Sequence, residues 1–208
     1  MASVGSELAC QTVLELLEVH FDEGKTADDV NEGTARDWLA AVREAIGCEA
    51  AENELAMRDY ACTLLLAVIG PTRAFYFQVG DGAIVVGDPS GDWSWVFWPS
   101  RGEFANATFF VTDDSLSQNV MIDSGKAVQE IAVFTDGIEP LVLHYASKTV
   151  FAPFFENMFP PVRKSIAAGL DEALSADLAN YLGSSAVNNR TDDDKTLVLA
   201  SKVEAADS

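Results

Sequence analysis

Aspartates stand at three points where an apolar segment of the sequence ends or begins. Asp81 follows FYFQVG, Asp136 follows EIAVFT, and the run of Asp192, Asp193 and Asp194 precedes KTLVLA. The ends of strands in a rigid sheet can aim such side chains at a common point. Converging carboxylates repel one another, and their pKa values rise unless a cation neutralises them. Because Mg²⁺ and Mn²⁺ prefer oxygen ligands, these positions predict a site for a divalent metal ion.

Each position also suits a purely structural role. Asp81-Gly82 lies between two runs rich in aromatic and β-branched residues, which is the strongest short-range signal for a two-residue hairpin turn. Asp136 before Gly137 suits a helix cap, and TDDDKT suits an acidic loop. Local spacing therefore leaves the metal site and the turn aspartates open as equal alternatives.

The elements that must position these residues can be predicted from hydrophobic periodicity. Apolar residues recur at helical spacing in Ser3–Phe21 and Ala27–Ile46, and a short third helix is expected at Ala50–Met57. From Asp59 the pattern becomes alternating or continuously apolar, with turn clusters such as GPT, GDG and DSG between the runs. Seven strands are expected there: Tyr60–Ile69, Ala74–Val79, Ala83–Val86, Trp93–Trp98, Ala107–Val111, Val120–Ile122 and Glu130–Phe134.

Helices are expected again near the C-terminus, before one last strand. Successive strands with tight turns predict antiparallel pairing rather than alternating βαβ units, and continuous apolar runs predict strands covered on both faces. The expected fold is α+β, a four-layer α-β-β-α sandwich of two antiparallel sheets in a single domain over residues 1–203, with a disordered tail at 204–208. The late helices are predicted at Glu139–Thr149, Phe151–Glu156 and Gly169–Leu182, and the last strand at Thr196–Val203.

Charge and composition exclude several classes of partner. The 33 acidic residues against 13 Lys and Arg give a net charge of -20, which repels phosphate backbones and anionic membrane surfaces and predicts no binding to nucleic acid or membrane. No segment has the length of an apolar membrane span. The start MASVGSELACQ lacks the features of a signal peptide, so a cytoplasmic location is predicted. His20 and His144 lack partners at metal-ligand spacing and are interpreted as structural.

Five segments in order resemble signatures of a known enzyme family. They are RDYACTLLLAVI, FYFQVGDGAIVV, WPSRGEFANATFFVTDD, IAVFTDGIEPL and TDDDKTLVLA. Together they resemble the type 2C metal-dependent serine/threonine protein phosphatases, in particular their divergent bacterial branch. The resemblance implies an α-β-β-α sandwich with a binuclear Mn²⁺ or Mg²⁺ centre. It also implies hydrolysis of phosphoserine and phosphothreonine in proteins by a metal-activated water, with a cognate serine/threonine kinase as a further partner.

The resemblance implies particular metal ligands. Asp136 matches the aspartate of the family's strand-end Asp-Gly, and Asp193 matches the aspartate of its terminal motif because Thr196 follows three residues later. Asp194 replaces an asparagine of that motif, which leaves Asp192 and Asp194 open as alternatives to Asp193. Asp81 matches the aspartate that helps to hold an additional ion, so it is predicted to be both a hairpin tip and a metal-site carboxylate.

The start of the chain departs from the family pattern. The family has an N-terminal strand pair that supplies an acidic ligand and a phosphate-binding arginine, followed by an Asp-Gly turn that supplies the bridging aspartate. Here MASVGSELACQTVLELL resembles the helix that comes after that turn. The expectation is therefore an N-terminally incomplete phosphatase domain. The alternative is a catalytically inactive member of the fold that acts as a regulatory or scaffold protein.

Overall fold

The computed structural model describes residues 1–88, 90–99, 108–115 and 119–203. Two compact units make up the chain. Unit 1 contains Met1–Asp81 and Pro99–Ala127, and unit 2 contains Gly82–Trp98 and Val128–Ser208. The predicted single domain over residues 1–203 stays a prediction, and the predicted disordered tail lies outside the described residues.

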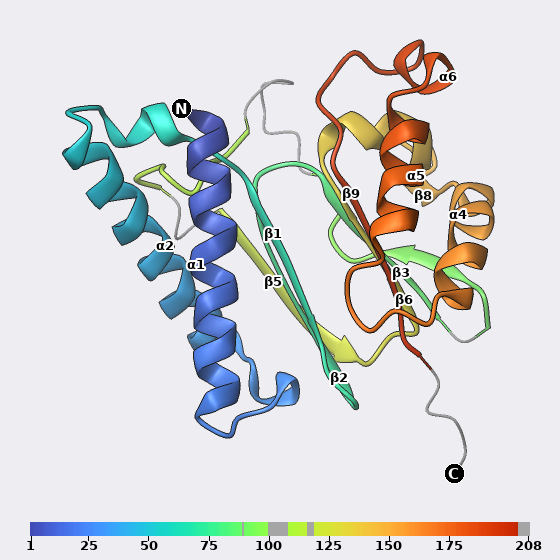
Figure 1. Cartoon of the computed structure of the whole chain (residues 1–208), viewed down its shortest axis with the longest axis horizontal. Coiled ribbons are helices and arrows are strands. Elements are labelled where there is room, and N and C mark those ends of the chain that lie inside the picture. Colours follow the sequence, from blue (N-terminus) through green and yellow to red (C-terminus); the bar gives the residue numbers. More distant parts are fainter. Residues whose placement is uncertain (89, 100–107, 116–118, 204–208) are drawn as a thin grey trace. The chain divides into compact units, whose positions relative to one another are not determined.

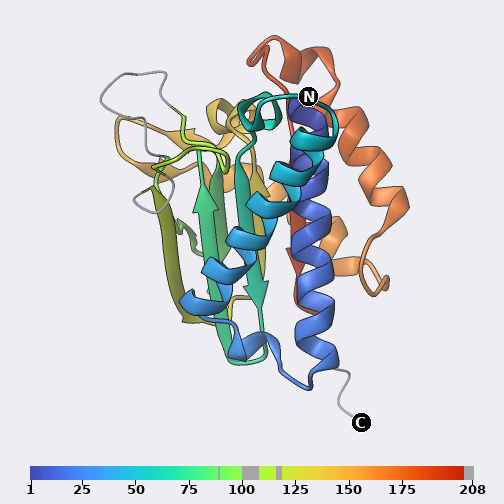
Figure 2. The same cartoon turned by 90° about the vertical axis from the view of Figure 1, so that its left-hand side faces the viewer.

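Unit 1 is a helical hairpin packed on a three-stranded antiparallel sheet. The strands are β1 (Leu64–Ile69), β2 (Arg73–Val79) and β5 (Val120–Lys126), with β2 in the centre of the order β1-β2-β5. Helices α1 (Ala2–Asp22) and α2 (Glu32–Glu52) run side by side over this sheet (Figures 1 and 2). Two short 3₁₀-helices, η1 (Ala27–Asp29) and η2 (Met57–Tyr60), connect these elements.

The core of unit 1 lies between its helices and one face of β2. Alternate residues of a strand point to the same face, and Phe75, Phe77 and Val79 accordingly join one apolar cluster with Val42 and Ile46 of α2. The residues between them on β2 are buried as well. A strand buried on both faces is what its largely apolar sequence, interrupted by the buried Gln78, predicts.

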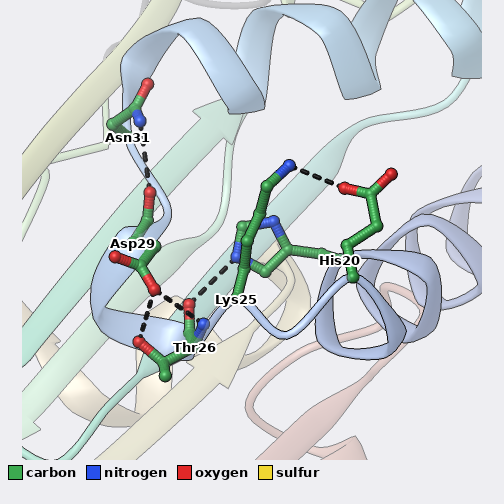
Figure 3. Close-up of polar contacts among 6 residues, drawn as sticks. His20, Lys25, Thr26, Asp29 and Asn31 are labelled. Atoms are coloured by element: carbon green, nitrogen blue, oxygen red, sulfur yellow. Dashed lines mark hydrogen bonds and ion pairs between the residues drawn. The ribbon is translucent and has the colours of Figure 1, made fainter.

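The connection between α1 and α2 is held by polar contacts (Figure 3). Nε2 of the buried His20 lies 3.0 Å from the carbonyl oxygen of Thr26, and the backbone N–H of Thr26 donates to Asp29 Oδ2 at 2.7 Å. Asn31 then caps α2 by accepting from the N–H of Gly33 at 2.9 Å. His20 therefore has a structural role, as its sequence context predicts.

Unit 2 contains a four-stranded antiparallel sheet in the order β4-β3-β6-β9. Its strands are β3 (Ala83–Gly87), β4 (Trp93–Trp95), β6 (Glu130–Phe134) and β9 (Leu197–Ser201). Helices α4 (Ala152–Lys164) and α5 (Glu172–Leu182) lie on one side of this sheet (Figure 1). The shorter elements are η4 (Asp136–Ile138), α3 (Glu139–Val142), the hairpin of β7 (Leu143–His144) and β8 (Thr149–Val150), and α6 (Ser185–Asn188).

Aromatic packing dominates the core of unit 2. The ring of Trp93 stacks on Phe155 and lies next to Phe159, with centroid separations of 4.9 Å in both pairs. Phe155 and Phe159 are fully buried on α4. Trp93, the first residue of the expected strand Trp93–Trp98, is half-buried and packs against this core, whereas Trp95 is exposed and the strand ends there.

Two helix predictions are wrong because local turns interrupt the helical pattern. Residues Glu139–Thr149 form only the four-residue α3, after which Leu143 pairs with Val150 in a hairpin whose turn places Lys148 at a φ of 51°. The expected helix at Ala50–Met57 does not form, because α2 continues to Glu52 and Glu54 adopts a φ of 55°.

One strand prediction also fails among the described residues. Residues 108–111 of the expected strand Ala107–Val111 are not part of a sheet, and Ala107 itself lies outside the described residues. The carboxylate of Asp113 accepts from the N–H of Phe110 at 2.8 Å, and the N–H of Asp113 donates to the carbonyl of Phe110 at 3.0 Å. This turn consumes the backbone groups that a strand ladder needs.

The described part of the chain contains no helix whose length and apolar character would let it cross a membrane.

Candidate metal centre

The pairing of β6 with β9 brings two of the predicted acidic positions to one end of the unit 2 sheet. The two strands are antiparallel, with Phe134 opposite Leu197. The ladder continues one residue further, where the N–H of Thr135 donates to the carbonyl of Thr196 at 3.1 Å and the N–H of Thr196 donates to Thr135 Oγ1 at 3.0 Å. Asp136 follows Thr135 of this last pair, and the run Asp192–Asp194 is separated from Thr196 by Lys195 alone.

The contact between the two segments is close at the backbone level. A Cβ atom on Gly137 would stand only 2.2 Å from the carbonyl oxygen of Asp194. The hydroxyl of Thr135 donates to the same carbonyl at 3.4 Å. Glycine is needed at position 137 because no side chain fits between the two backbones. The Asp-Gly pair of the sequence thus serves close packing of the two acidic segments.

The carboxylates at this point differ in exposure and bonding. Asp136 is half-buried, and its Oδ1 accepts from the N–H of Gly137 at 2.9 Å. Asp193 is exposed, and its Oδ1 accepts from the N–H of Asp194 at 3.1 Å. The ammonium of Lys195 donates to the carbonyl of Asp193 at 3.1 Å.

Asp81 belongs to unit 1 and has its own local partner. Its Oδ2 accepts a short hydrogen bond from the hydroxyl of Thr108. The flanking Gly80 and Gly82 have φ values of 95° and 94°, which strongly favour glycine. A Cβ on Gly80 would also stand 2.3 Å from the Thr63 side chain. The aspartate is therefore held in a closely packed, glycine-dependent segment.

The predicted hairpin at Asp81-Gly82 is wrong. β2 pairs with β1 and β5, whereas β3 pairs with β4 and β6, so the strands before and after Asp81 belong to different sheets. A turn signal in the sequence is local, but the partner of each strand is chosen by long-range packing. Asp81 thus lies where the chain leaves one sheet and enters the other.

Glu139 is a buried acid that sequence reasoning missed. It is 3% exposed, and its carboxylate accepts from the N–H of Gly82 at 3.2 Å and from the hydroxyl of Tyr145. Its only signal in the sequence is an acidic residue three positions after Asp136. An acidic residue in the first turn of a helix is common and usually solvated, so that signal does not separate a buried acid from an exposed one.

Comparison with known proteins identifies the family. The family model for protein phosphatase 2C matches residues 1–182. The chain is also 38% identical over 197 residues to serine/threonine-protein phosphatase 3 of Escherichia coli (strain K12), a match that covers 94% of this chain and 76% of that protein. The chain belongs to the protein phosphatase 2C family.

Solved structures of serine/threonine phosphatases have a similar fold. The catalytic domain of the phosphatase PstP in complex with two manganese ions has a TM-score of 0.57 at 18% identity, covering 97% of this chain and 82% of that chain. PstP/Ppp of Mycobacterium tuberculosis has a TM-score of 0.61 at 14% identity, covering 97% and 83%. These similarities and the observed elements confirm the predicted α+β class with two antiparallel sheets and flanking helices.

The metal that a protein phosphatase 2C fold implies can be tested against the donors present. Asp136, Asp193 and the backbone around Asp194 offer oxygen atoms, the donor type that Mn²⁺ and Mg²⁺ prefer. Within the described ranges, no group of three or more His, Cys, Asp or Glu side chains is arranged to hold a metal ion. The donors of unit 2 fit part of a coordination shell by their chemistry, and a hard divalent ion commonly completes its shell with water.

Proposed function

We propose that this chain is a metal-dependent phosphatase that hydrolyses phosphoserine and phosphothreonine in proteins. Membership of the protein phosphatase 2C family and the relative named as a serine/threonine-protein phosphatase support this function. The observation that carries it is the contact of the Asp136-Gly137 turn with the Asp194 backbone. This contact puts the two acidic segments of unit 2 side by side.

We propose Asp136 and Asp193 as ligands of a binuclear Mn²⁺ or Mg²⁺ centre and Asp81 as a ligand of a third ion. Such ions lower the pKa of a bound water and stabilise the oxygens of the transferred phosphoryl group. The protein's own contribution in unit 2 is orientation. Gly137 lets the two backbones meet, and Thr135 ties them together through its hydroxyl.

The same function implies partners. Phosphoproteins are the proposed substrates, and a serine/threonine kinase that phosphorylates them is proposed as the functional counterpart. The family relationship supports the substrate class, whereas the kinase rests on the resemblance alone. The cytoplasmic location stays a prediction from the N-terminal sequence.

The decisive experiment measures hydrolysis of a phosphothreonine peptide and of p-nitrophenyl phosphate with and without Mn²⁺. The wild-type chain is compared with Asp136→Asn, which keeps the size of the side chain and removes its charge. Asp177→Asn serves as a matched control because Asp177 is an exposed aspartate of α5 in the same unit. We expect Mn²⁺-dependent turnover in the wild type and the control, and loss of turnover in Asp136→Asn.

Two other results would change the interpretation. Full activity in Asp136→Asn would contradict the ligand assignment. Binding of the phosphopeptide by a folded wild-type chain without turnover would favour the inactive regulatory or scaffold protein. No observation on the described residues favours that alternative at present.

A further inference from the structure

Glu139 is buried, unlike an acidic residue on the solvent-exposed surface of a helix. It is the first residue of α3, it is 3% exposed, and both oxygens of its carboxylate accept hydrogen bonds. The N–H of Gly82 donates to Oε1 at 3.2 Å, and the hydroxyl of Tyr145 donates to Oε2. Burial of a carboxylate is costly unless hydrogen bonds compensate for lost water. Through these hydrogen bonds, the side chain of Glu139 connects α3 with Gly82 and with Tyr145.

The segments that Glu139 connects lie at the end of the unit 2 sheet where the metal centre is proposed. Gly82 directly precedes β3, whose first residue Ala83 pairs with Phe134 at the end of β6. Asp136 follows β6 two residues after Phe134, and Glu139 follows Asp136 by three. The carboxylate thus connects the start of β3 with the turn that carries Asp136.

A second buried acid of the same unit shows what a purely structural carboxylate looks like here. Glu130 is 4% exposed and forms a two-pronged ion pair with Arg163 of α4. Glu130 is the first residue of β6. At the rise per residue of a β-strand, it lies about 20 Å along the chain from Asp136. Glu139 lies three residues after the proposed ligand Asp136 and accepts from a backbone N–H and from a phenol.

We propose that Glu139 is a positioning residue of the metal centre, which holds the Asp136 turn against the start of β3 while Tyr145 fixes the orientation of its carboxylate. This inference rests on the proposed function. It assigns Glu139 no contact with the metal or with substrate. Its effect is to keep the backbone that carries Asp136 in the geometry for metal binding.

The test compares Glu139→Ala, Glu139→Gln and Tyr145→Phe with the wild type and with Glu130→Gln as the control. Metal binding is measured without catalysis, as the rise in thermal unfolding temperature during titration with Mn²⁺. The Mn²⁺ dependence of kcat and KM for the phosphothreonine peptide is measured in parallel. Glu139→Gln and Tyr145→Phe preserve most of the shape of the site, so they remain informative if Glu139→Ala does not fold.

Loss of a residue that supports a metal ligand typically reduces metal affinity or activity about 10–100-fold. We expect Glu139→Ala to raise the half-saturating Mn²⁺ concentration within that range and to lower kcat with KM nearly unchanged. Glu139→Gln should recover part of the affinity, because its amide oxygen can still accept from Gly82. Tyr145→Phe should weaken binding less than Glu139→Ala, and Glu130→Gln should lower stability without changing the half-saturating Mn²⁺ concentration.

The outcomes separate this inference from the proposed function. An unchanged half-saturating Mn²⁺ concentration in all folded Glu139 and Tyr145 variants would overturn the positioning role and leave the phosphatase assignment intact. A wild-type chain that shows no response to Mn²⁺ in unfolding temperature or in activity would contradict both. Weaker binding in Glu130→Gln equal to that in Glu139→Gln would show a general effect of destabilisation and would also overturn the positioning role.

Discussion

Gly137 approaches the carbonyl of Asp194 so closely that an added Cβ atom would stand 2.2 Å from the oxygen. Real Cβ atoms essentially never come so close to another atom. The two nearest atoms, the carbonyl oxygen and carbon of Asp194, belong to the backbone and cannot move away as a flexible side chain could. The close approach joins two segments that are far apart in the chain. The hydrogen bond between Thr135 and Asp194, for example, links residues 59 positions apart. The geometry of the candidate metal centre therefore depends on the absence of one methyl group.

Gly137→Ala should reduce Mn²⁺-dependent turnover and destabilise unit 2. The added methyl forces the Asp136 turn and the aspartate run apart, and overpacking of this kind costs about 1–3 kcal/mol. Gly47→Ala is the matched control, because a Cβ at this position on α2 meets no atom within 4 Å and Ala is favoured over Gly in a helix. Chemical denaturation and peptide hydrolysis of both variants provide the measurement. Equal stability and activity in the two variants would contradict the close contact.

The local parts of the fold were predictable from the sequence, whereas several pairings were not. The strand Glu130–Phe134 is found with the predicted bounds, because a short β-branched run ends at a clear turn signal. The Asp81-Gly82 segment has an equally clear turn signal, yet it joins two sheets. The conformation of a turn is encoded nearby, but the partners of β2 and β3 depend on residues far along the chain.

The candidate site shows the same division. Asp136 and the run at Asp192–Asp194 could be proposed from the sequence because each lies near the end of an apolar strand. Glu139 was missed because its burial depends on the hydroxyl of Tyr145 and the N–H of Gly82, and no periodicity in the sequence announces either contact. The hairpin of β7 and β8 explains this, because it replaces the predicted helix in the segment that contains Tyr145.

Removal of the cation that pairs with Glu130 should destabilise unit 2. In Arg163→Ala the buried carboxylate loses both guanidinium hydrogen bonds and keeps the long bond from the Ser201 hydroxyl at 3.5 Å, and a poorly satisfied buried polar group costs about 1–3 kcal/mol. The loss of stability should be smaller than for a fully buried ion pair, because the Arg163 side chain is 49% exposed. Lys164→Ala tests loss of the adjacent, exposed cation of α4. Urea denaturation at pH 7 that gives the same unfolding free energy for both variants would contradict this prediction.

Acid should weaken the connection between η1 and the β1-β2 hairpin. The hydroxyl of Thr72 donates to Asp28 Oδ2 at 2.6 Å, and the N–H of Arg73 donates to Oδ1 at 2.9 Å. The hydrogen bond from the Thr72 side chain is the main cause that lowers the pKa of Asp28 below its ordinary value. A carboxyl with a lowered pKa in the folded state stabilises the protein above its unfolded pKa, and this contribution disappears as the pH falls through the folded pKa.

Asp28→Asn should therefore unfold at a lower temperature than the wild type at pH 7, with a difference that shrinks below about pH 4. Unfolding temperatures of both proteins between pH 3 and pH 7 provide the measurement. Asp177→Asn, which changes an exposed aspartate of α5, should follow the wild type across the range. A difference between wild type and Asp28→Asn that stays constant with pH would show that the charge of Asp28 does not contribute.

The three adjacent aspartates before β9 can be distinguished by single substitutions. We expect Asp193→Asn to lose Mn²⁺-dependent turnover by more than the roughly 10–100-fold that loss of a supporting residue costs, because Asp193 is the proposed ligand. Asp192→Asn and Asp194→Asn should keep most activity, since Asp194 contributes its backbone carbonyl to the contact with Gly137, which the substitution leaves in place.

Each of these variants removes one negative charge from the same exposed loop, so they serve as controls for one another. An equal loss of activity in all three variants would indicate a general effect of the loop's charge on the cation, because salt screens the interaction between charges little over such short distances. A selective loss in Asp192→Asn or Asp194→Asn would move the ligand by one residue, and full activity in all three would remove this loop from the metal centre. The half-saturating Mn²⁺ concentration decides among these outcomes, because a lost ligand lowers metal affinity whereas a lost substrate contact raises KM for the peptide.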